Sequence, residues 1–256
     1  MRLAIVNRPR LVVVHSLTAH GRVGLKPFLD VIGVDCLPVP SLVASGPGDM
    51  PGARRQTLDP ADLLLATLEA CSGLATPVDL FIGYLADATQ AERLAKVVDK
   101  RRDRIRHLIV DPVCGDDGRA YVARELIERW SVLLARADWL LPNATEAMLL
   151  TGTQHAESIE ALRVRYPHAG IVVTGLLTED AVETHVQPPP PARAFVHRQP
   201  RISGRANGTG DLFAATWWHE FCQSSRSLEE AVDVAARAAA TLVAVQPPAS
   251  LVPSFP

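Results

Sequence analysis

The segment NGTGD, residues 207–211, has the composition of a helix start that binds an anion and carries a base. Gly208 and Gly210 permit positive φ and close backbone approach, so several N–H groups can converge on one anion. The helix predicted to begin there adds the positive end of its dipole. Asp211 is placed to accept a proton from a hydroxyl that attacks a phosphoryl group held by those amides. A glycine-rich turn whose aspartate only stabilises the helix start is the alternative, and the spacing leaves both open.

A second polar group lies in the segment DPVCGDDG, residues 111–118. Asp111 ends an apolar strand candidate, and Asp116 and Asp117 stand in a glycine-flanked turn. Carboxylates this close in the sequence could organise Mg²⁺, directly or through water. An ordinary polar turn explains the same residues, because aspartate and glycine are what turns prefer.

Asn143 and Glu146 mark the point where a strand candidate gives way to a helix candidate, in the segment LPNATEAMLLTG. Their spacing is that of a capping box, in which two side chains satisfy N–H groups at a helix start. The functional interpretation is that both side chains point at a metal–phosphate cluster. The two roles do not exclude each other.

The composition argues against several classes of partner. The net charge of −2 over 256 residues gives no overall basic field for nucleic acid or an anionic membrane. The four cysteines form no CxxC pair, which favours reduced thiols over a zinc site or a disulfide scaffold. Neither a signal-peptide pattern nor an apolar run of roughly 18 residues is found. We therefore expect a cytoplasmic protein whose partners are small molecules, with no nucleic acid and no membrane.

Short apolar runs alternate along the chain with longer amphipathic patterns, which indicates an α/β fold with a parallel sheet covered on both faces. The strand candidates are 10–16, 34–39, 78–84, 107–113, 138–143 and 170–175. The helix candidates are 22–32, 59–72, 87–101, 122–136, 144–151, 156–166, 209–223 and 227–245. Ligands of such sheets bind beyond the carboxyl ends of the strands. Polar or small residues stand at those ends, among them Ser16, Tyr84, Asp111, Asn143 and Thr174.

No boundary divides the chain, so we expect a single domain over residues 1–256. The pattern becomes irregular between 176 and 203, and the segment QPPPPAR, 187–193, cannot be sheet centre or helix interior. We expect an exposed proline-rich loop or hairpin tip there. The segment GRVGLK, 21–26, lacks the GxxxxGK[ST] spacing, so a P-loop NTPase is not expected.

Six segments, in order along the chain, resemble the pyridoxal kinases of the ribokinase-like superfamily. They are HSLTAHGRVG, GYL, DPVCGDDGRAYV, LPNATEAMLLTG, IVVTG and GTGDLFAA. The resemblance implies a three-layer α/β/α sandwich with a central, mostly parallel sheet. It implies an ATP- and Mg²⁺-dependent kinase, commonly a homodimer, that phosphorylates the 5′-hydroxymethyl group of pyridoxal or a related B6 vitamer. A monovalent cation is a further cofactor that the resemblance leaves open.

The resemblance also implies roles for single residues. Asp211 matches the base that deprotonates the hydroxymethyl group, and Gly208, Thr209 and Gly210 match the anion hole for the transferred phosphoryl group. The positions that handle Mg²⁺ and the ATP phosphates are matched by Asp111, Asn143, Glu146 and Thr174. The two carboxylates of that set would be the metal ligands. The residues matched to the pyridine ring are Ser16, as a hydrogen-bond partner, and Val23 and Tyr84, as packing partners.

The substrate end departs from the family pattern. An SNHT-like segment is usual after Ser41, whereas this chain has SGPGDM at 45–50, with Gly48 in place of a threonine contact. His20 replaces an aromatic residue, and the tail after Ala244 is short and proline-rich. These differences leave two alternatives: a kinase of the same fold for another hydroxymethyl heterocycle or a sugar, and a non-catalytic vitamer-binding protein. Asp211 argues against a hydroxymethylpyrimidine kinase, which typically has cysteine at that place, and against a binding protein, which needs no base. It leaves a sugar kinase open, because the GTG-Asp ending is common to many sugar and vitamin kinases of the superfamily.

Overall fold

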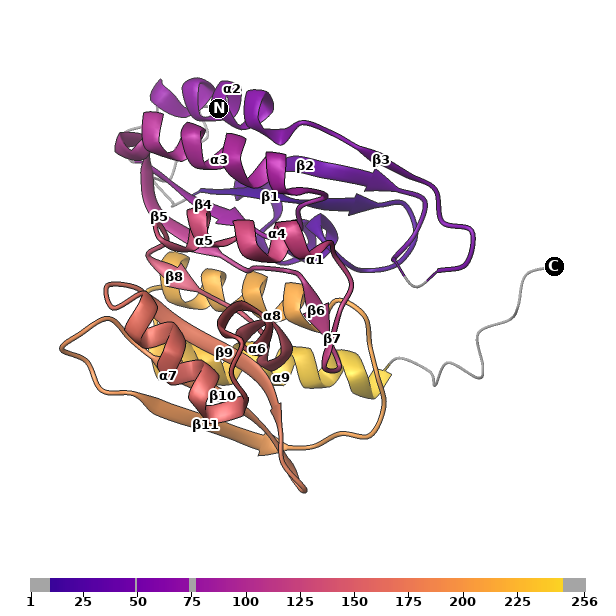
Figure 1. The fold of residues 1–256 in the computed structure, drawn as a ribbon, viewed down its shortest axis with the longest axis vertical. Coiled ribbons are helices and arrows are strands. Elements are labelled where there is room, and N and C mark those ends of the chain that lie inside the picture. The colour runs from indigo at the N-terminus through magenta and orange to yellow at the C-terminus, as the bar shows by residue number, and fades with distance from the viewer. Residues whose placement is uncertain (1–9, 49, 74–76, 246–256) are drawn as a thin grey trace, which may run out of the picture.

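The computed structural model describes residues 10–48, 50–73 and 77–245. Within them, a sheet of nine strands is covered by helices on both faces, and the expected three-layer α/β/α sandwich with a mostly parallel sheet is confirmed (Figure 1). The strand order is β11-β10-β9-β8-β5-β4-β1-β2-β3. The N-terminal segment searched for a signal peptide and most of the proline-rich tail lie outside the described residues.

The centre of the sheet is parallel and its edges are antiparallel. The parallel strands are β1 (Leu11–Thr18), β2 (Cys36–Ala44), β4 (Val78–Ile82), β5 (Ile105–Val110), β8 (Trp139–Leu140) and β9 (Gly170–Leu177). The antiparallel strands are β3 (Arg55–Thr57) at one end of the sheet, and β10 (Ala181–Gln187) and β11 (Phe195–Pro200) at the other. A separate small hairpin pairs β6 (Gly115–Asp116) with β7 (Arg119–Ala120).

The strand period of two divides the core into two clusters, one on each face of the sheet. In β1, Val12 and Val14 belong to one cluster, and Leu11 and Val13 belong to the other. The first face is covered by α2 (Pro60–Ala70), α3 (Ala88–Lys100), α4 (Arg124–Arg129), α5 (Ser131–Leu134), α6 (Ala144–Thr151) and α7 (His155–Arg165). The second face is covered by α1 (Leu25–Ile32), α8 (Thr209–Trp218) and α9 (Leu228–Val245). Both faces of the parallel strands are therefore buried, which explains their continuous apolar sequences.

Local sequence sets several helix ends. The side chain of Asp59 accepts the N–H of Ala61 at the start of α2, and Asp87 accepts the N–H of Gln90 at the start of α3. The predicted helix 22–32 begins only at Leu25, because Gly24 has φ 67° and lies outside the helical region.

Two predicted elements are shorter than expected. The predicted helix 122–136 is divided at Trp130 into α4 and α5, and the Trp130 side chain is fully buried. The predicted helix 209–223 ends as an α-helix at Trp218 and continues as a π-helical turn over His219–Gln223. Tertiary packing of large side chains thus overrides a continuous helical pattern.

The irregular region 176–203 forms the antiparallel hairpin of β10 and β11 at one end of the sheet (Figure 1). The proline-rich segment connects these two strands, and residues 190–194 are exposed. Half-buried edge strands carry mixed polar and apolar residues, which is why periodicity did not reveal them.

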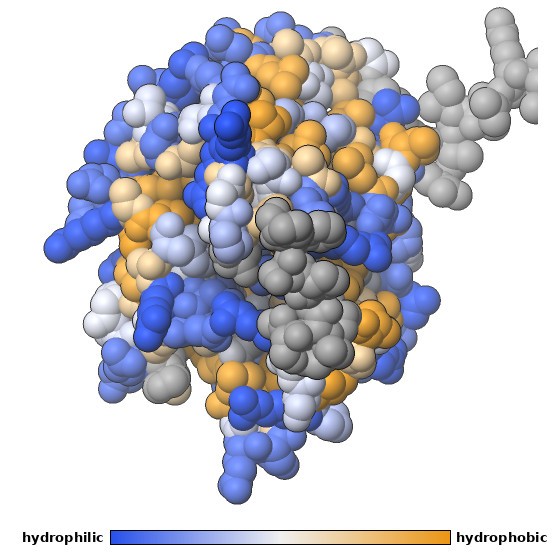
Figure 2. All heavy atoms as spheres, turned by 90° about the vertical axis from the view of Figure 1, so that its right-hand side faces the viewer, coloured by the Kyte–Doolittle hydropathy of each residue, from blue (hydrophilic) through white to orange (hydrophobic). Residues whose placement is uncertain are grey.

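None of the described helices is both long and apolar enough to cross a membrane. Exposed large apolar side chains come from separate elements, such as Val34 after α1, Leu177 at the end of β9 and Val196 in β11. On the face shown in Figure 2, hydrophilic and hydrophobic side chains are interspersed. Single exposed apolar residues of this kind are ordinary for a folded protein surface.

Candidate active site

The carboxyl ends of five neighbouring strands bring the predicted polar residues to one edge of the sheet. Backbone hydrogen bonds run from Gly83 N–H to the Val14 carbonyl (2.8 Å) and from Asp111 N–H to the Ile82 carbonyl (2.9 Å). Further along, Thr174 N–H donates to the Pro142 carbonyl (3.0 Å), and Asn143 and Thr174 form a parallel bridge. The order along this edge is Ser16, Tyr84, Asp111, Asn143 and Thr174. This is where open α/β sheets bind ligands.

The start of α8 packs against the loop between β1 and α1. Gly208 is the N-cap of α8 with φ 85°, a left-handed conformation that favours glycine. A Cβ at this position would lie 2.0 Å from the carbonyl oxygen of Arg22, so no larger residue fits without movement. Gly210 has open space around its own Cβ direction. The glycine-rich segment therefore touches the Arg22 backbone at Gly208 and borders open space at Gly210.

Asp211 lies in the first turn of α8, with a side chain that is 13% exposed. Its Oδ2 accepts a 2.6 Å hydrogen bond from the backbone N–H of Gly24. Its Oδ1 lies 3.0 Å from Nε2 of His15, a residue of β1. His15 was not among the residues predicted from the sequence to have a role. A histidine directly after the apolar run of β1 was the available signal, because a buried imidazole needs a polar partner.

Asp111 and Glu146 form a buried acidic pair. Both carboxyls are more than nine-tenths buried, and neither has an ion-pair partner among the residues that the structure describes. Glu146 and Asn143 form the expected capping box, and Glu146 also accepts the N–H of Cys114 at 3.1 Å. Burial raises the pKa of Asp111 well above its usual range, and the neighbouring charges of Glu146 and Asp211 raise it further. Burial likewise raises the pKa of Glu146, against the lowering effect of its backbone hydrogen bonds.

An acidic pair of this kind fits a divalent cation, because a cation would offset the cost of burying two carboxylates. Of the three aspartates in the segment 111–118, only Asp111 belongs to the buried acidic pair. Asp116 and Asp117 are exposed in the β6–β7 hairpin and form ion pairs with Arg205. The expected grouping of all three aspartates is therefore not found.

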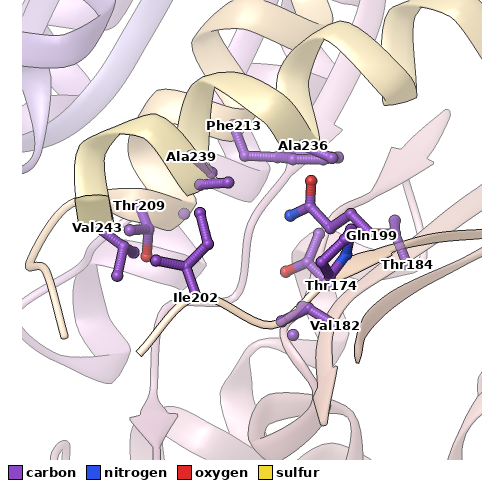
Figure 3. A pocket seen from close by; sticks show the side chains of 14 residues that line it. Thr174, Val182, Thr184, Gln199, Ile202, Thr209, Phe213, Ala236, Ala239 and Val243 are labelled. Carbon is purple, nitrogen blue, oxygen red and sulfur yellow. The ribbon is translucent and has the colours of Figure 1, made fainter. Parts of the chain in front are cut away.

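A cavity of about 170 Å³ opens next to the start of α8 (Figure 3). One wall comes from α8 and α9 and includes Phe213, Ala236 and Ala239, and the other comes from the β9–β11 strands (Figure 3). Thr174, Thr209 and Gly210 also line it. Three residues matched to phosphate contacts thus border one mostly apolar cavity, which is the usual character of a small-molecule site.

The residues predicted to contact the substrate lie at the same end of the sheet as Asp211. A Cβ at Gly24 would lie 2.1 Å from the Ser16 carbonyl, and Val23 adjoins the backbone at Gly208. Tyr84 follows Gly83, and its carbonyl accepts a 2.6 Å hydrogen bond from the Ser41 hydroxyl. The structure therefore brings Ser16, Val23 and Tyr84 to the same end of the sheet as the predicted base.

The altered segment 45–50 covers the turn after β1. The N–H of His20 donates to the Ser45 carbonyl at 3.0 Å, and a Cβ at Gly21 would lie 2.8 Å from Cγ of Pro47. The carbonyl of Gly48 accepts a 3.0 Å hydrogen bond from Arg55. The segment that departs most from the family pattern is thus packed on the loop that carries Val23 and Gly24.

A separate cluster of Asp79, His107 and Cys222 has ligand atoms close enough to hold a metal ion. The Asp79 side chain is fully buried and accepts two hydrogen bonds from Arg106 and one of 2.7 Å from Trp218. Because the guanidinium already neutralises this carboxylate, we interpret the cluster as a structural ion pair.

Comparison with known proteins gives a family and a fold. The sequence model of the family described as phosphomethylpyrimidine kinase matches residues 50–249. The pyridoxal kinase of Arabidopsis thaliana is 28% identical over 228 residues, which cover 80% of this chain and 72% of that protein. The solved structure of pyridoxal kinase from Entamoeba histolytica is similar with a TM-score of 0.84 at 22% identity, covering 94% of this chain and 90% of that chain.

A second solved structure, pyridoxal kinase from Leishmania donovani in complex with ADP and pyridoxamine, is similar with a TM-score of 0.78 at 23% identity. The similarity covers 92% of this chain and 86% of that chain. At these sequence identities the structural similarity shows that the fold is shared. The shared fold covers most of this chain.

Proposed function

We propose a reaction for this chain, which belongs to the phosphomethylpyrimidine kinase family: transfer of the γ-phosphoryl group of ATP to the 5′-hydroxymethyl group of pyridoxal or a related B6 vitamer. The names of its relatives support the substrate class, and the solved complex of a relative with ADP and pyridoxamine supports both ligand classes. The proposed product from pyridoxal is pyridoxal 5′-phosphate.

The observation that carries the proposal is the position of Asp211 between a cavity and the loop that precedes α1. On one side lies the cavity bordered by Thr174, Thr209 and Gly210. On the other lies the loop of Val23 and Gly24, whose N–H holds the Asp211 carboxylate. A base at the junction of a nucleotide cavity and an acceptor site is the arrangement that in-line phosphoryl transfer requires.

In the proposed mechanism, Asp211 accepts the proton of the hydroxymethyl group as its oxygen attacks the phosphoryl group. The backbone N–H groups at Gly208, Thr209 and Gly210, together with the helix dipole of α8, stabilise the charge on the transferred group. The apolar cavity between α9 and the β9–β11 strands is proposed to hold the nucleotide base, with Thr174 near the phosphates.

Asp111 and Glu146 are proposed to hold Mg²⁺, with Asn143 close to the phosphates. The Asn143 side chain itself accepts the N–H of Glu146 and donates to the Gly115 carbonyl, each at 2.9 Å, so its part is to order the metal site. A bound Mg²⁺ supplies charge neutralisation for the phosphate groups of ATP. The positive charge of the cation would in turn compensate the negative charges of the two buried carboxylates. A homodimer, a monovalent-cation requirement and a cytoplasmic location stay predictions from the sequence.

The test is a panel of acceptors offered in parallel with Mg-ATP: pyridoxal, pyridoxine, pyridoxamine, hydroxymethylpyrimidine and ribose. ADP release with one or more B6 vitamers, together with the matching phosphate ester detected by mass, is the expected result. ADP release with none of the vitamers but with another acceptor would overturn the proposed substrate and keep the reaction class.

Hydroxymethylpyrimidine is the second candidate acceptor. It is favoured by the family description and by the altered segment 45–50, which is packed on the proposed acceptor site. Asp211 argues for the vitamers, because the resemblance assigns cysteine to that position in hydroxymethylpyrimidine kinases. The ratio of kcat/KM values for the two acceptors decides between the candidates.

A further inference from the structure

His15 is held in a single tautomer by its own strand. Its side chain is only 3% exposed, and its Nδ1 accepts a 2.8 Å hydrogen bond from the backbone N–H of Ser16. A nitrogen that accepts a hydrogen bond carries no proton, so the neutral ring has its proton on Nε2. The tautomer therefore follows from backbone geometry.

The orientation of the His15 ring is fixed by packing. The ring is parallel to that of Phe81, with an interplanar angle of 9° and centroids 6.4 Å apart, and it also contacts Phe28. A Cβ at Gly83 would lie 2.1 Å from Cδ2 of His15, so the ring lies directly on the glycine backbone. Aromatic side chains on two sides and a backbone on another leave the ring little freedom to rotate.

The Nε2–H of His15 lies next to the Asp211 carboxylate. Nε2 is 3.0 Å from Oδ1, but the N–H is not aligned with that oxygen, and Nε2 is a buried nitrogen without a hydrogen-bond partner among the described residues. The second oxygen, Oδ2, accepts the N–H of Gly24 at 2.6 Å. Each carboxylate oxygen thus has one N–H group beside it, and the two N–H groups belong to different elements.

We propose that His15 is a positioning residue for Asp211, which it holds with its Nε2–H in the orientation needed to accept a proton from the substrate. The inference rests on the proposed function, in which Asp211 is the base. Hydrogen bonds from Gly24 to one oxygen and from His15 to the other would fix the plane of the carboxylate, and each oxygen would keep lone-pair capacity for the acceptor hydroxyl. A side chain of the same size without an N–H would fill the space and leave the carboxylate plane free to turn.

Two substitutions distinguish the effect of the His15 N–H donor from the effect of the packing of its ring. His15→Leu removes the N–H, and His15→Gln retains one. We expect His15→Leu to lower kcat by about 10-fold or more, with KM values for ATP and the vitamer within about 3-fold of wild type. We expect His15→Gln to recover kcat to within about 3-fold of wild type. His185→Leu, which removes a 2.9 Å histidine–glutamate contact in β10, is the matched control and leaves kcat unchanged.

A double-mutant cycle with Asp211→Asn then tests whether His15 acts through Asp211. Once the carboxylate is gone, His15→Leu is expected to lower the residual kcat by less than about 2-fold. An equal loss in both backgrounds would overturn the proposal, and so would a His15→Gln variant as slow as His15→Leu at an unchanged melting temperature.

A measurement that needs no turnover separates this inference from the proposed function. ¹⁵N NMR of the histidine rings, with His15 assigned by the His15→Gln spectrum, is expected to show the proton on Nε2 and a shift of Nε2 in Asp211→Asn. A proton on Nδ1, or an Nε2 resonance indifferent to Asp211→Asn, would overturn the positioning role. If wild type turns over no acceptor, the proposed function fails, and the NMR result alone decides on the contact.

Discussion

Gly24 and Asp211 are 187 positions apart in the sequence, yet the backbone N–H of Gly24 donates a 2.6 Å hydrogen bond to Oδ2 of Asp211. The bond joins the loop after β1 to the start of α8. Close contact between Gly208 and the Arg22 carbonyl joins the same two segments a second time. The loop of Val23 and Gly24 and the glycine-rich helix start are therefore in contact at two points, and the position of the proposed base depends on both.

Asp211→Asn is predicted to lower kcat by at least about 10²-fold, because an amide cannot accept the proton of the attacking hydroxyl. Nucleotide affinity should stay largely intact, since the cavity walls are unchanged. Steady-state ADP release and calorimetric ATP binding measure the two effects. Asp99→Asn, in a surface ion pair with Arg136, is the control and should leave both unchanged. Near-normal turnover by Asp211→Asn would remove its role as base.

Gly208→Ala is predicted to lower both stability and kcat. Its left-handed φ disfavours a side chain by roughly 1–2 kcal/mol, and the new Cβ would also collide with the Arg22 carbonyl. Gly152→Ala is the matched control, because Gly152 has a similar φ of 75° and nothing within 4 Å of its Cβ direction. Chemical denaturation should show the larger loss for Gly208→Ala, together with a fall in kcat of about 10-fold or more. Equal losses in stability and activity for the two variants would show that the contact with Arg22 is unimportant.

Ala239→Phe is predicted to fill the cavity beside α9 and to raise KM for ATP by about 10-fold or more. Ala239 lines that cavity (Figure 3). Its neighbour Ala238 is not among the residues that line it. Ala238→Phe therefore carries the same side chain on the same helix as a control. Vitamer binding, followed by fluorescence or calorimetry, should be unchanged in both variants. If KM for ATP responds equally to both substitutions, the nucleotide base does not bind in this cavity.

The buried acidic pair predicts a stability that falls as the pH rises. Burial raises the pKa of Glu146 to about 8, and it raises the pKa of Asp111 as well. A carboxyl with a raised native pKa binds its proton more tightly in the native than in the unfolded chain. Its stabilising effect is therefore present below the ordinary carboxyl range near 4 and is lost as the pH rises towards the native value.

Chemical denaturation without divalent cations should give a free energy of unfolding lower at pH 8 than at pH 5, by an amount on the order of 2 kcal/mol. Asp111→Asn, which cannot ionise at that position, should reduce this difference. Added Mg²⁺ should stabilise wild type at pH 8 by mass action and stabilise Asp111→Asn much less. A pH dependence identical in wild type and Asp111→Asn would show that Asp111 ionises freely in the native chain.

Much of the fold was predictable from the sequence because its central strands are buried on both faces. The strand candidates at 10–16, 78–84 and 170–175 correspond to β1, β4 and β9, and the three-layer sandwich is confirmed. The resemblance to the pyridoxal kinases of the ribokinase-like superfamily is confirmed by the family match and by the relatives. The edge strands β10 and β11 could not be predicted, because half-exposed strands lack a continuous apolar pattern.

The site was predictable where local chemistry defines it and unpredictable where it depends on long-range contacts. Asn143 and Glu146 form the capping box that their spacing predicts. The proximity of His15 and Gly24 to Asp211 depends on how β1 and α8 pack, which no local pattern contains. The pairing of the 116–117 carboxylates with Arg205, in place of a metal site with Asp111, is likewise a long-range effect.

The most direct test of the central claim follows the transferred phosphorus itself. Wild-type protein is incubated with pyridoxal, Mg²⁺ and ATP, and ³¹P NMR monitors the γ-phosphoryl signal over time. We expect a new phosphate-ester resonance of pyridoxal 5′-phosphate that grows in step with ADP and is absent with Asp211→Asn. ADP with inorganic phosphate and no ester, or an ester formed equally well by Asp211→Asn, would contradict it.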